Sequence, residues 1–186
     1  MFILLGAGAL SMRIDARKIG SILLLTLFLL SILILLMPDL LKQFNIGSID
    51  IRNVELVDID TGDRFRLGSL KPGKIFLVVY HGNSRDVLRG IINLLDNIGA
   101  YLEFKGYTVV VVLSGGSLSD FRDFLAGEDP LIFNRYRWLY DSNNLVSRSL
   151  GHVSNYGRIF IIGDGWEYTY VGDTSLSPEV IMSRIP

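Results

Sequence analysis

The sequence predicts a three-layer α/β/α sandwich with a central mixed sheet, preceded by one N-terminal transmembrane helix. Apolar strands alternate with helical patterns along most of the chain, which is typical of a sheet covered by helices on both faces. Near the C-terminus, Asp164-Gly165 directly follows an apolar strand and favours a tight hairpin, so at least one strand pair is antiparallel. An uncharged apolar run at residues 19–37 predicts the membrane helix.

The N-terminal region is predicted to cross a membrane once. It divides into a leader at residues 1–18, a transmembrane helix at 19–37 that would contact the lipid bilayer, and a linker at 38–48, with the folded domain at 49–186. A helix rises about 1.5 Å per residue, so the apolar run spans roughly 30 Å, the thickness of a hydrocarbon core. The run is longer than the apolar region of a cleavable signal peptide, so we expect an uncleaved anchor.

Basic residues before the apolar run predict its orientation. Arg13, Arg17 and Lys18 directly precede the run, whereas Asp39 and Lys42 roughly cancel after it. The positive-inside rule therefore places the N-terminus in the cytoplasm and the folded domain on the other side. We expect a single-pass protein of the cell membrane with an extracytoplasmic domain.

The composition excludes several classes of function. The chain contains no cysteine, which excludes disulfides, thiolate catalysis and thiolate metal sites. After Met37 the chain has 15 basic and 18 acidic residues, so a nucleic-acid partner, which requires a basic surface, is not expected. Gly115-Gly116-Ser117 matches neither a P-loop nor a dinucleotide fingerprint, so we expect a plain turn and no cofactor.

The folded domain begins with a predicted hairpin and a central strand. Residues 49–59 and 64–67 flank Asp60-Thr61-Gly62-Asp63, a turn in which Gly62 can adopt a positive φ. The continuously apolar run at 75–80 predicts a strand that is buried on both faces.

Helices and strands alternate after the central strand. Ser84 is a suitable N-cap for a helix of roughly twenty residues, whose apolar residues recur every three or four positions until Gly106. The other predicted elements are strand 107–113, helix 117–125, strand 137–140, a helical turn at 143–150, strand 158–162, strand 166–171 and helix 177–185.

Three short sequence segments occur in the order in which one known fold family carries them. They are 57–62 followed by Gly73-Lys74, 138–153, and 158–165 followed by Gly172. Together with the element order, they make the chain similar to the redoxin group of the thioredoxin superfamily, which includes membrane-anchored thioredoxin-like proteins and, more distantly, peroxiredoxins. The resemblance spans most of residues 54–185 and implies a thioredoxin-like fold.

The resemblance also shows which family residues are missing. It places Ser84 where the nucleophilic cysteine belongs, Val87 where the resolving cysteine belongs, and Tyr156 where these proteins usually carry a cis-proline. A serine hydroxyl cannot replace a thiolate in disulfide exchange, because its pKa is far higher and it forms no mixed disulfide. The resemblance therefore implies a degenerate member without thiol oxidoreductase or peroxidase activity and without catalytic residues.

Two other kinds of chemistry remain open at the same turn. The resemblance places His81 and His152 on one edge of the domain, where they could hold copper or zinc with help from a carboxylate such as Asp86. Hydrogen-bonded loop histidines are the alternative. A hydrolase could use Ser84 with His81 and Asp86, but the sequence lacks the G-x-S-x-G elbow, and helix capping explains Ser84 without chemistry.

A second group of candidates combines aromatic and arginine side chains, which are enriched at protein interfaces. Its residues alternate along a predicted strand, so the other interpretation is one strand face against the core. The group comprises Phe133, Arg135, Tyr136, Arg137, Trp138 and Tyr140, and Trp166, Tyr168 and Tyr170 could extend the same surface.

The sequence as a whole predicts a redox-inactive, membrane-anchored thioredoxin-like domain. We expect it to act as a binding, structural or assembly subunit of a membrane protein complex, with other membrane subunits as partners. The alternatives are a copper carrier that uses His81 and His152, and an unrecognised hydrolase.

Overall fold

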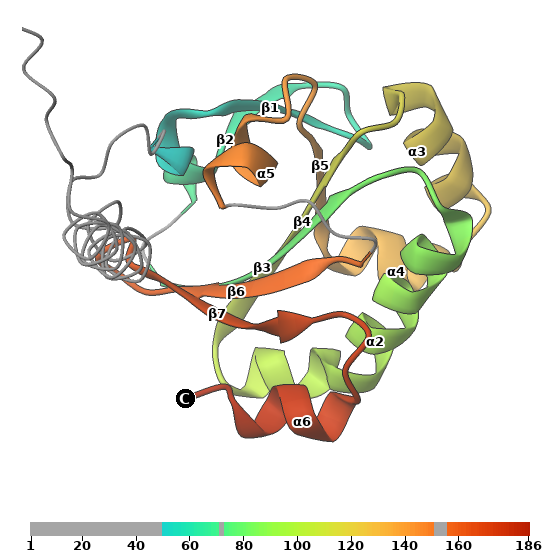
Figure 1. Cartoon of the computed structure of the whole chain (residues 1–186). Helices are drawn as coiled ribbons and strands as arrows, with labels where there is room; N and C mark the ends of the chain where they lie inside the picture. The colour runs from blue at the N-terminus through green and yellow to red at the C-terminus, as the bar shows by residue number, and fades with distance from the viewer. Residues whose placement is uncertain (1–49, 71–72, 151–155) are drawn as a thin grey trace, which may run out of the picture. The chain divides into compact units, whose positions relative to one another are not determined.

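The computed structural model describes residues 50–70, 73–150 and 156–186 (Figure 1). Within these ranges no helix has the length and apolar character needed to span a bilayer. The leader, transmembrane helix and linker predicted for residues 1–48 lie outside the described residues, so the anchor stays a prediction.

In the described part of the chain, seven strands form one mixed sheet in the order β2-β1-β5-β4-β3-β6-β7. The three central strands β3, β4 and β5 are parallel, and the strands on either side pair with them antiparallel. The strands are β1 (Glu55–Asp58), β2 (Arg64–Arg66), β3 (Lys74–His81), β4 (Tyr107–Ser114), β5 (Arg137–Tyr140), β6 (Arg158–Ile162) and β7 (Tyr168–Asp173).

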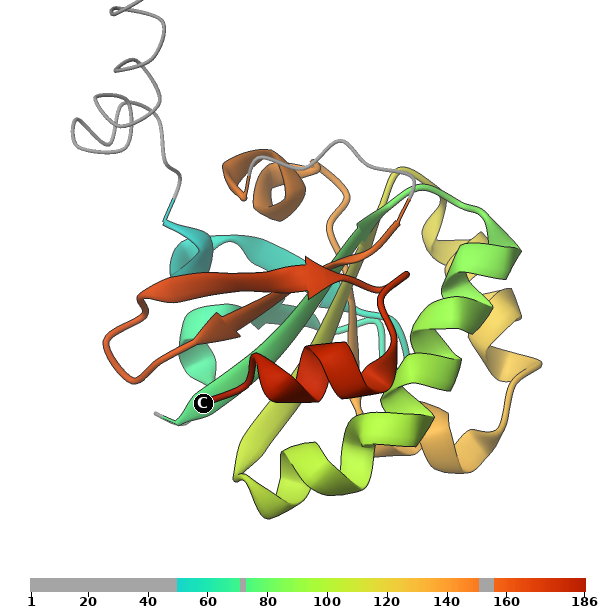
Figure 2. The same ribbon diagram turned by 60° about the horizontal axis from the view of Figure 1, so that its bottom comes forward.

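Helical segments cover both faces of this sheet (Figures 1 and 2). One face packs against α2 (Arg85–Phe104), α3 (Leu118–Ala126), α4 (Pro130–Arg135) and α6 (Pro178–Ser183), which together form the first core. The other face packs against α5 (Leu145–Ser149) and two 3-10 turns, η1 (Ile51–Asn53) and η2 (Leu67–Ser69), which form the second core. The predicted α/β/α layering around a mixed sheet is confirmed.

Strand β3 contributes to both cores, which explains its continuous apolar sequence. Side chains alternate across a strand, so neighbouring residues enter opposite layers. Phe76, Val78 and Tyr80 belong to the first core, and Ile75, Leu77 and Val79 belong to the second.

Helix α2 has the predicted start and length, but its N-terminus is satisfied differently. Ser84 occupies the N-cap position, and Asp86 lies in the first turn, where the helix dipole favours an anion. The Ser84 side chain, however, makes no capping hydrogen bond. The expectation that its hydroxyl caps the helix is therefore wrong.

The first predicted strand is shorter than expected. Residues 49–59 were expected to be extended, but η1 occupies Ile51–Asn53 and β1 covers only Glu55–Asp58. The Asp50 carboxylate accepts a hydrogen bond of 3.1 Å from the backbone N–H of Arg52, which favours a helical turn there. Gly62 in the following turn has the expected positive φ of 80°.

The C-terminal hairpin has a five-residue loop instead of a two-residue turn. The N–H of Gly163 donates to the carbonyl of Glu167 and the N–H of Trp166 to the carbonyl of Gly163, both at 3.0 Å. Trp166 has a φ of 63°, so it takes the left-handed position of the loop. Strand β7 consequently begins at Tyr168 and not at Trp166.

Candidate functional site

The turn between β3 and α2 lies at the carboxyl end of the parallel strands. His81, the last residue of β3, pairs with Ser114, the last residue of β4, and Leu113 pairs with Tyr140 at the end of β5. Ligands of open α/β sheets bind at this edge, because the loops that follow the strands converge there.

A hollow of about 430 Å³ opens at this turn. It is lined by Tyr80, His81, Gly82, Asn83, Ser84, Val87 and Tyr156. The structure thus brings together all three positions at which the resemblance predicts missing catalytic residues, Ser84, Val87 and Tyr156. Tyr156 is half exposed at the rim.

The hydroxyl of Tyr80 satisfies the start of α2 from below. The backbone N–H of Ser84 donates a hydrogen bond of 3.1 Å to this buried hydroxyl, which uses one of the donors that a helix N-terminus leaves unpaired. A Cβ at Gly82, which has a φ of 152°, would lie 2.6 Å from the same oxygen, so glycine is required there. Sequence reasoning missed this contact, because Tyr80 looks like an ordinary core residue of the strand.

His81 is tied to the layer beneath the turn. Its Nδ1 lies 3.1 Å from the hydroxyl of Ser114, which in turn lies 3.3 Å from the hydroxyl of Ser147 in α5. Both serines are buried. The buried carboxylate of Asp141 accepts the N–H of Leu145 at 3.0 Å and fixes the start of α5. A polar chain therefore connects the hollow to the opposite face of the sheet.

This geometry bears on the two chemical alternatives. Among the described residues, no group of three histidine, cysteine, aspartate or glutamate side chains could hold a metal ion. His152 lies outside the described residues, so its pairing with His81 is untested. No hydrogen bond joins Ser84 to His81 or Asp86, all three of which are described, so the contacts of a hydrolase triad are not formed there.

The aromatic candidates near β5 belong to the interior. Tyr136 and Trp138 are only 7% and 3% exposed, and both contribute to the first core. The hydroxyl of Tyr136 donates a 3.0 Å hydrogen bond to the carbonyl of Leu95 in α2. Trp138 therefore fits the interpretation of a strand face against the core. Tyr136 precedes β5 and is also buried, so neither residue lies on the surface. Phe133 belongs to helix α4 and not to a strand.

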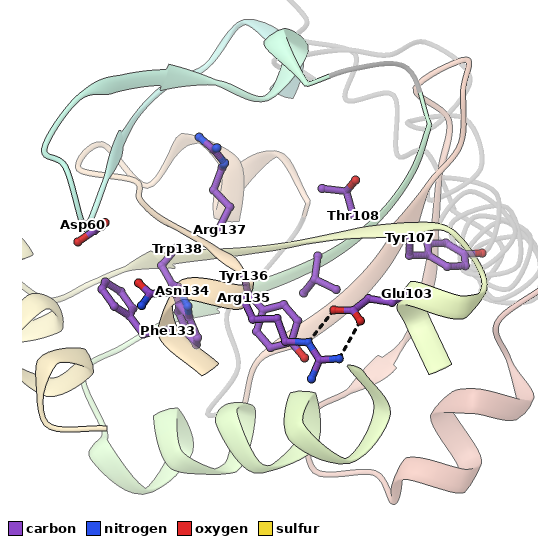
Figure 3. Close-up of a pocket in the computed structure, with 11 residues that line it drawn as sticks. Asp60, Glu103, Tyr107, Thr108, Phe133, Asn134, Arg135, Tyr136, Arg137 and Trp138 are labelled. Atoms are coloured by element: carbon purple, nitrogen blue, oxygen red, sulfur yellow. Dashed lines mark hydrogen bonds and ion pairs between the residues drawn. The ribbon is translucent and has the colours of Figure 1, made fainter. Parts of the chain in front are cut away.

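The two arginines beside them form contacts within the domain, and Figure 3 shows the ion pair of Arg135 with Glu103. Arg135 forms a bidentate ion pair with Glu103, with distances of 2.6 and 2.8 Å. Arg137 lies 3.4 Å from the Asp58 carboxylate, and its guanidinium stacks 4.5 Å from the ring centroid of Phe65. A groove of about 400 Å³ runs past these residues, at the amino ends of β4 and β5.

The remaining aromatic candidates lie on the C-terminal hairpin. Trp166 is half-buried against the second core, and Tyr168 and Tyr170 are 48% and 49% exposed on the edge strand β7. They form a surface separate from the β5 residues, because the β5 aromatics belong to the opposite core.

Comparison with known proteins identifies the fold. No protein-family model and no curated protein sequence matches the chain. An exposed lipoprotein thioredoxin of Streptococcus pneumoniae superposes with a TM-score of 0.55 and 22% identity, over 70% of this chain and 95% of that one. The chain has a thioredoxin-like fold. This likeness confirms the thioredoxin-like fold that the sequence resemblance implies. At such low sequence identity it establishes the fold alone.

Other structures with the thioredoxin-like fold give the same result. An Aquifex aeolicus protein described as a possible electron transfer protein superposes with a TM-score of 0.57 and 15% identity, over 74% of this chain and 90% of that one. Peroxiredoxin Q of Xanthomonas campestris superposes with a TM-score of 0.54 and 10% identity, over 72% and 90%. This chain has the thioredoxin-like fold without a single cysteine, which fits a degenerate form.

Proposed function

We propose that this chain is a single-pass membrane protein whose redox-inactive, thioredoxin-like domain binds another membrane subunit. In this role it acts as a subunit or assembly factor of a membrane complex, with its domain on the extracytoplasmic side. The observation that carries the proposal is the hollow at the turn between β3 and α2, which persists although the fold's thiol chemistry is impossible without cysteine.

The contacts around this hollow favour binding over catalysis. The start of α2 is held by Tyr80, and His81 is held by Ser114, so both polar groups are committed to structure. Asn83 and Ser84 remain exposed above them and present a rigid polar surface. A surface of this kind can recognise a partner without conformational change, which limits the entropic cost of association.

Co-purification of the full chain tests the proposal. The tagged protein would be solubilised from membranes in mild detergent and isolated together with its partner. We expect Asn83→Arg to abolish co-purification, because the long charged side chain would fill the hollow. Asn93→Arg is the matched control: Asn93 is also exposed, and it lies about 15 Å further along α2, at roughly 1.5 Å per residue.

Two results would contradict the proposal. A protein that always elutes alone as a monomer has no stable subunit partner. Equal loss of the partner in both arginine variants would show that the hollow does not select it.

A further inference from the structure

The C-terminal hairpin carries a strip of aromatic side chains, Trp166, Tyr168 and Tyr170, which we call the hairpin aromatics. All three lie on the second-core side of β7 and its loop. The ring of Tyr168 meets buried Phe160 edge-to-face and that of Tyr170 meets it at a tilt, with centroid distances of 6.2 and 5.6 Å. About half of each tyrosine is exposed, so one side of each ring contacts the domain and the other side faces solvent.

Trp166 occupies an unusual backbone position. Its φ of 63° is in the left-handed region, which bulky side chains rarely adopt. Its side chain packs against the second core. The loop therefore holds an aromatic side chain firmly at the tip of the hairpin.

The hairpin tip lies at the same end of the domain as the domain's N-terminus. Ile162, which precedes the loop, pairs with Ile75 at the beginning of β3. Ile51 and Trp166 both border the second core, and both views show η1 and the β6–β7 turn on one side of the domain (Figures 1 and 2). The hollow lies at the other end of β3.

The chain that precedes Ile51 limits how far this end can be from a membrane. Residues 38–50, thirteen in number, separate the proposed anchor from η1. Fully extended, they reach at most about 45 Å, and any turn or helix shortens this distance. The chain enters the domain at η1, so the end with the hairpin aromatics is the one that follows the proposed anchor most directly in the sequence.

We propose that the hairpin aromatics rest in the headgroup region of the bilayer. This inference rests on the proposed membrane anchor. Tryptophan and tyrosine favour the membrane–water interface, since each has an apolar ring and a polar group. The loop at residues 163–167 contains Asp164 and Glu167 and no basic residue, so the contact does not depend on anionic lipid.

The two tryptophans of the chain provide the test. The full chain would be reconstituted into phosphatidylcholine vesicles, with and without bromine on the acyl chains, which quenches nearby tryptophan. We expect brominated lipid to reduce the emission of Trp166, since a ring in the headgroup region lies next to the upper part of the acyl chains. Trp166→Phe should remove this quenching and leave the emission of core Trp138 unaffected. Trp138→Phe, which retains only Trp166, should show the full effect.

Three outcomes separate this inference from the proposed function. Quenching of Trp166 at both low and high salt supports it. No quenching in a protein that stays in the vesicles after alkaline carbonate extraction overturns the lipid contact and leaves the anchored binding subunit intact; chemical cross-linking of two copies through β7 would then identify a second copy as the occupant. Release of the chain by carbonate overturns both.

Discussion

The hydroxyl of Tyr136 donates a hydrogen bond of 3.0 Å to the carbonyl of Leu95 in α2, and this hydroxyl lies against Gly99 of the same helix. A Cβ at Gly99 would overlap this hydroxyl, so the glycine makes room for the contact. The first core therefore depends on the absence of one side chain from the buried face of its longest helix.

Gly99→Ala should destabilise the domain. The new methyl group must displace Tyr136, and overpacking of this kind costs about 1–3 kcal/mol. Gly90→Ala is the control, because that glycine is exposed on the same helix with no atom within 4 Å of an added Cβ, and it should stabilise by up to about 1 kcal/mol. Urea unfolding of the full chain in mild detergent, followed by circular dichroism, measures both. Equal effects would contradict the assigned contact.

Tyr136 should also make the domain sensitive to alkali. Burial raises the pKa of the Tyr136 phenol, an effect that nearby Arg135 partly opposes. Because the pKa is higher in the folded state, the stability is fully present below the unfolded value of about 10 and is lost as pH rises through the folded value. The midpoint of urea unfolding should fall above pH ~10. Tyr136→Phe should reduce this fall without abolishing it, since burial also raises the pKa of Tyr107 and Tyr170.

The ion pair of Glu103 and Arg135 should contribute in the opposite pH range. The hydrogen bonds from Arg135 lower the pKa of Glu103. The resulting stability is present above the unfolded pKa of about 4.3 and is lost as pH falls through the lower folded pKa. The Glu103 side chain is 51% exposed and that of Arg135 is 34% exposed, so solvent screening keeps the effect small. Glu103→Gln should flatten the acid side of the stability curve, and an unchanged curve would show that the pair contributes nothing.

Ser114→Ala should disturb the hollow through its floor. The buried hydroxyl contacts His81 and Ser147, and its removal leaves their polar groups without this partner, at a cost of about 1–3 kcal/mol. Ser183→Ala removes an exposed hydroxyl and should change stability by less than ~0.5 kcal/mol. NMR of the His81 ring provides a second measurement, since its chemical shifts should move only in Ser114→Ala. Unmoved shifts would argue against the polar chain.

Most of the fold could be predicted from local pattern. The central strand is a continuous apolar run, and α2 has a long, regular apolar repeat. Patterns of this length identify the type of element even where its first and last residues are uncertain. Helix α4 was missed, although Asp129-Pro130 is a good start signal: the carboxylate accepts the N–H of Leu131 at 2.9 Å. The alternating aromatic residues from Phe133 onward suggested a strand, and this pattern concealed a six-residue helix that ends at Arg135.

The candidate site was predictable in its positions and not in its contacts. The resemblance places Ser84, Val87 and Tyr156 at one turn, and in the structure all three line one hollow. The partnership of His81 with Ser114 joins residues 33 apart, and it depends on the register of two parallel strands. The hydrogen bond from the N–H of Ser84 to the Tyr80 hydroxyl likewise forms only because the turn folds back over the end of the strand.

Strand β3 connects the two ends of the domain that the proposals concern. Its eight residues extend over roughly 25 Å, from the end beside the hairpin loop to the hollow. Side chains of the strand pack into both cores, and this packing keeps the strand extended. In the proposed arrangement, a partner bound at the hollow would be held at this distance from the lipid-facing hairpin, and the domain would act as a spacer between a membrane and a second protein.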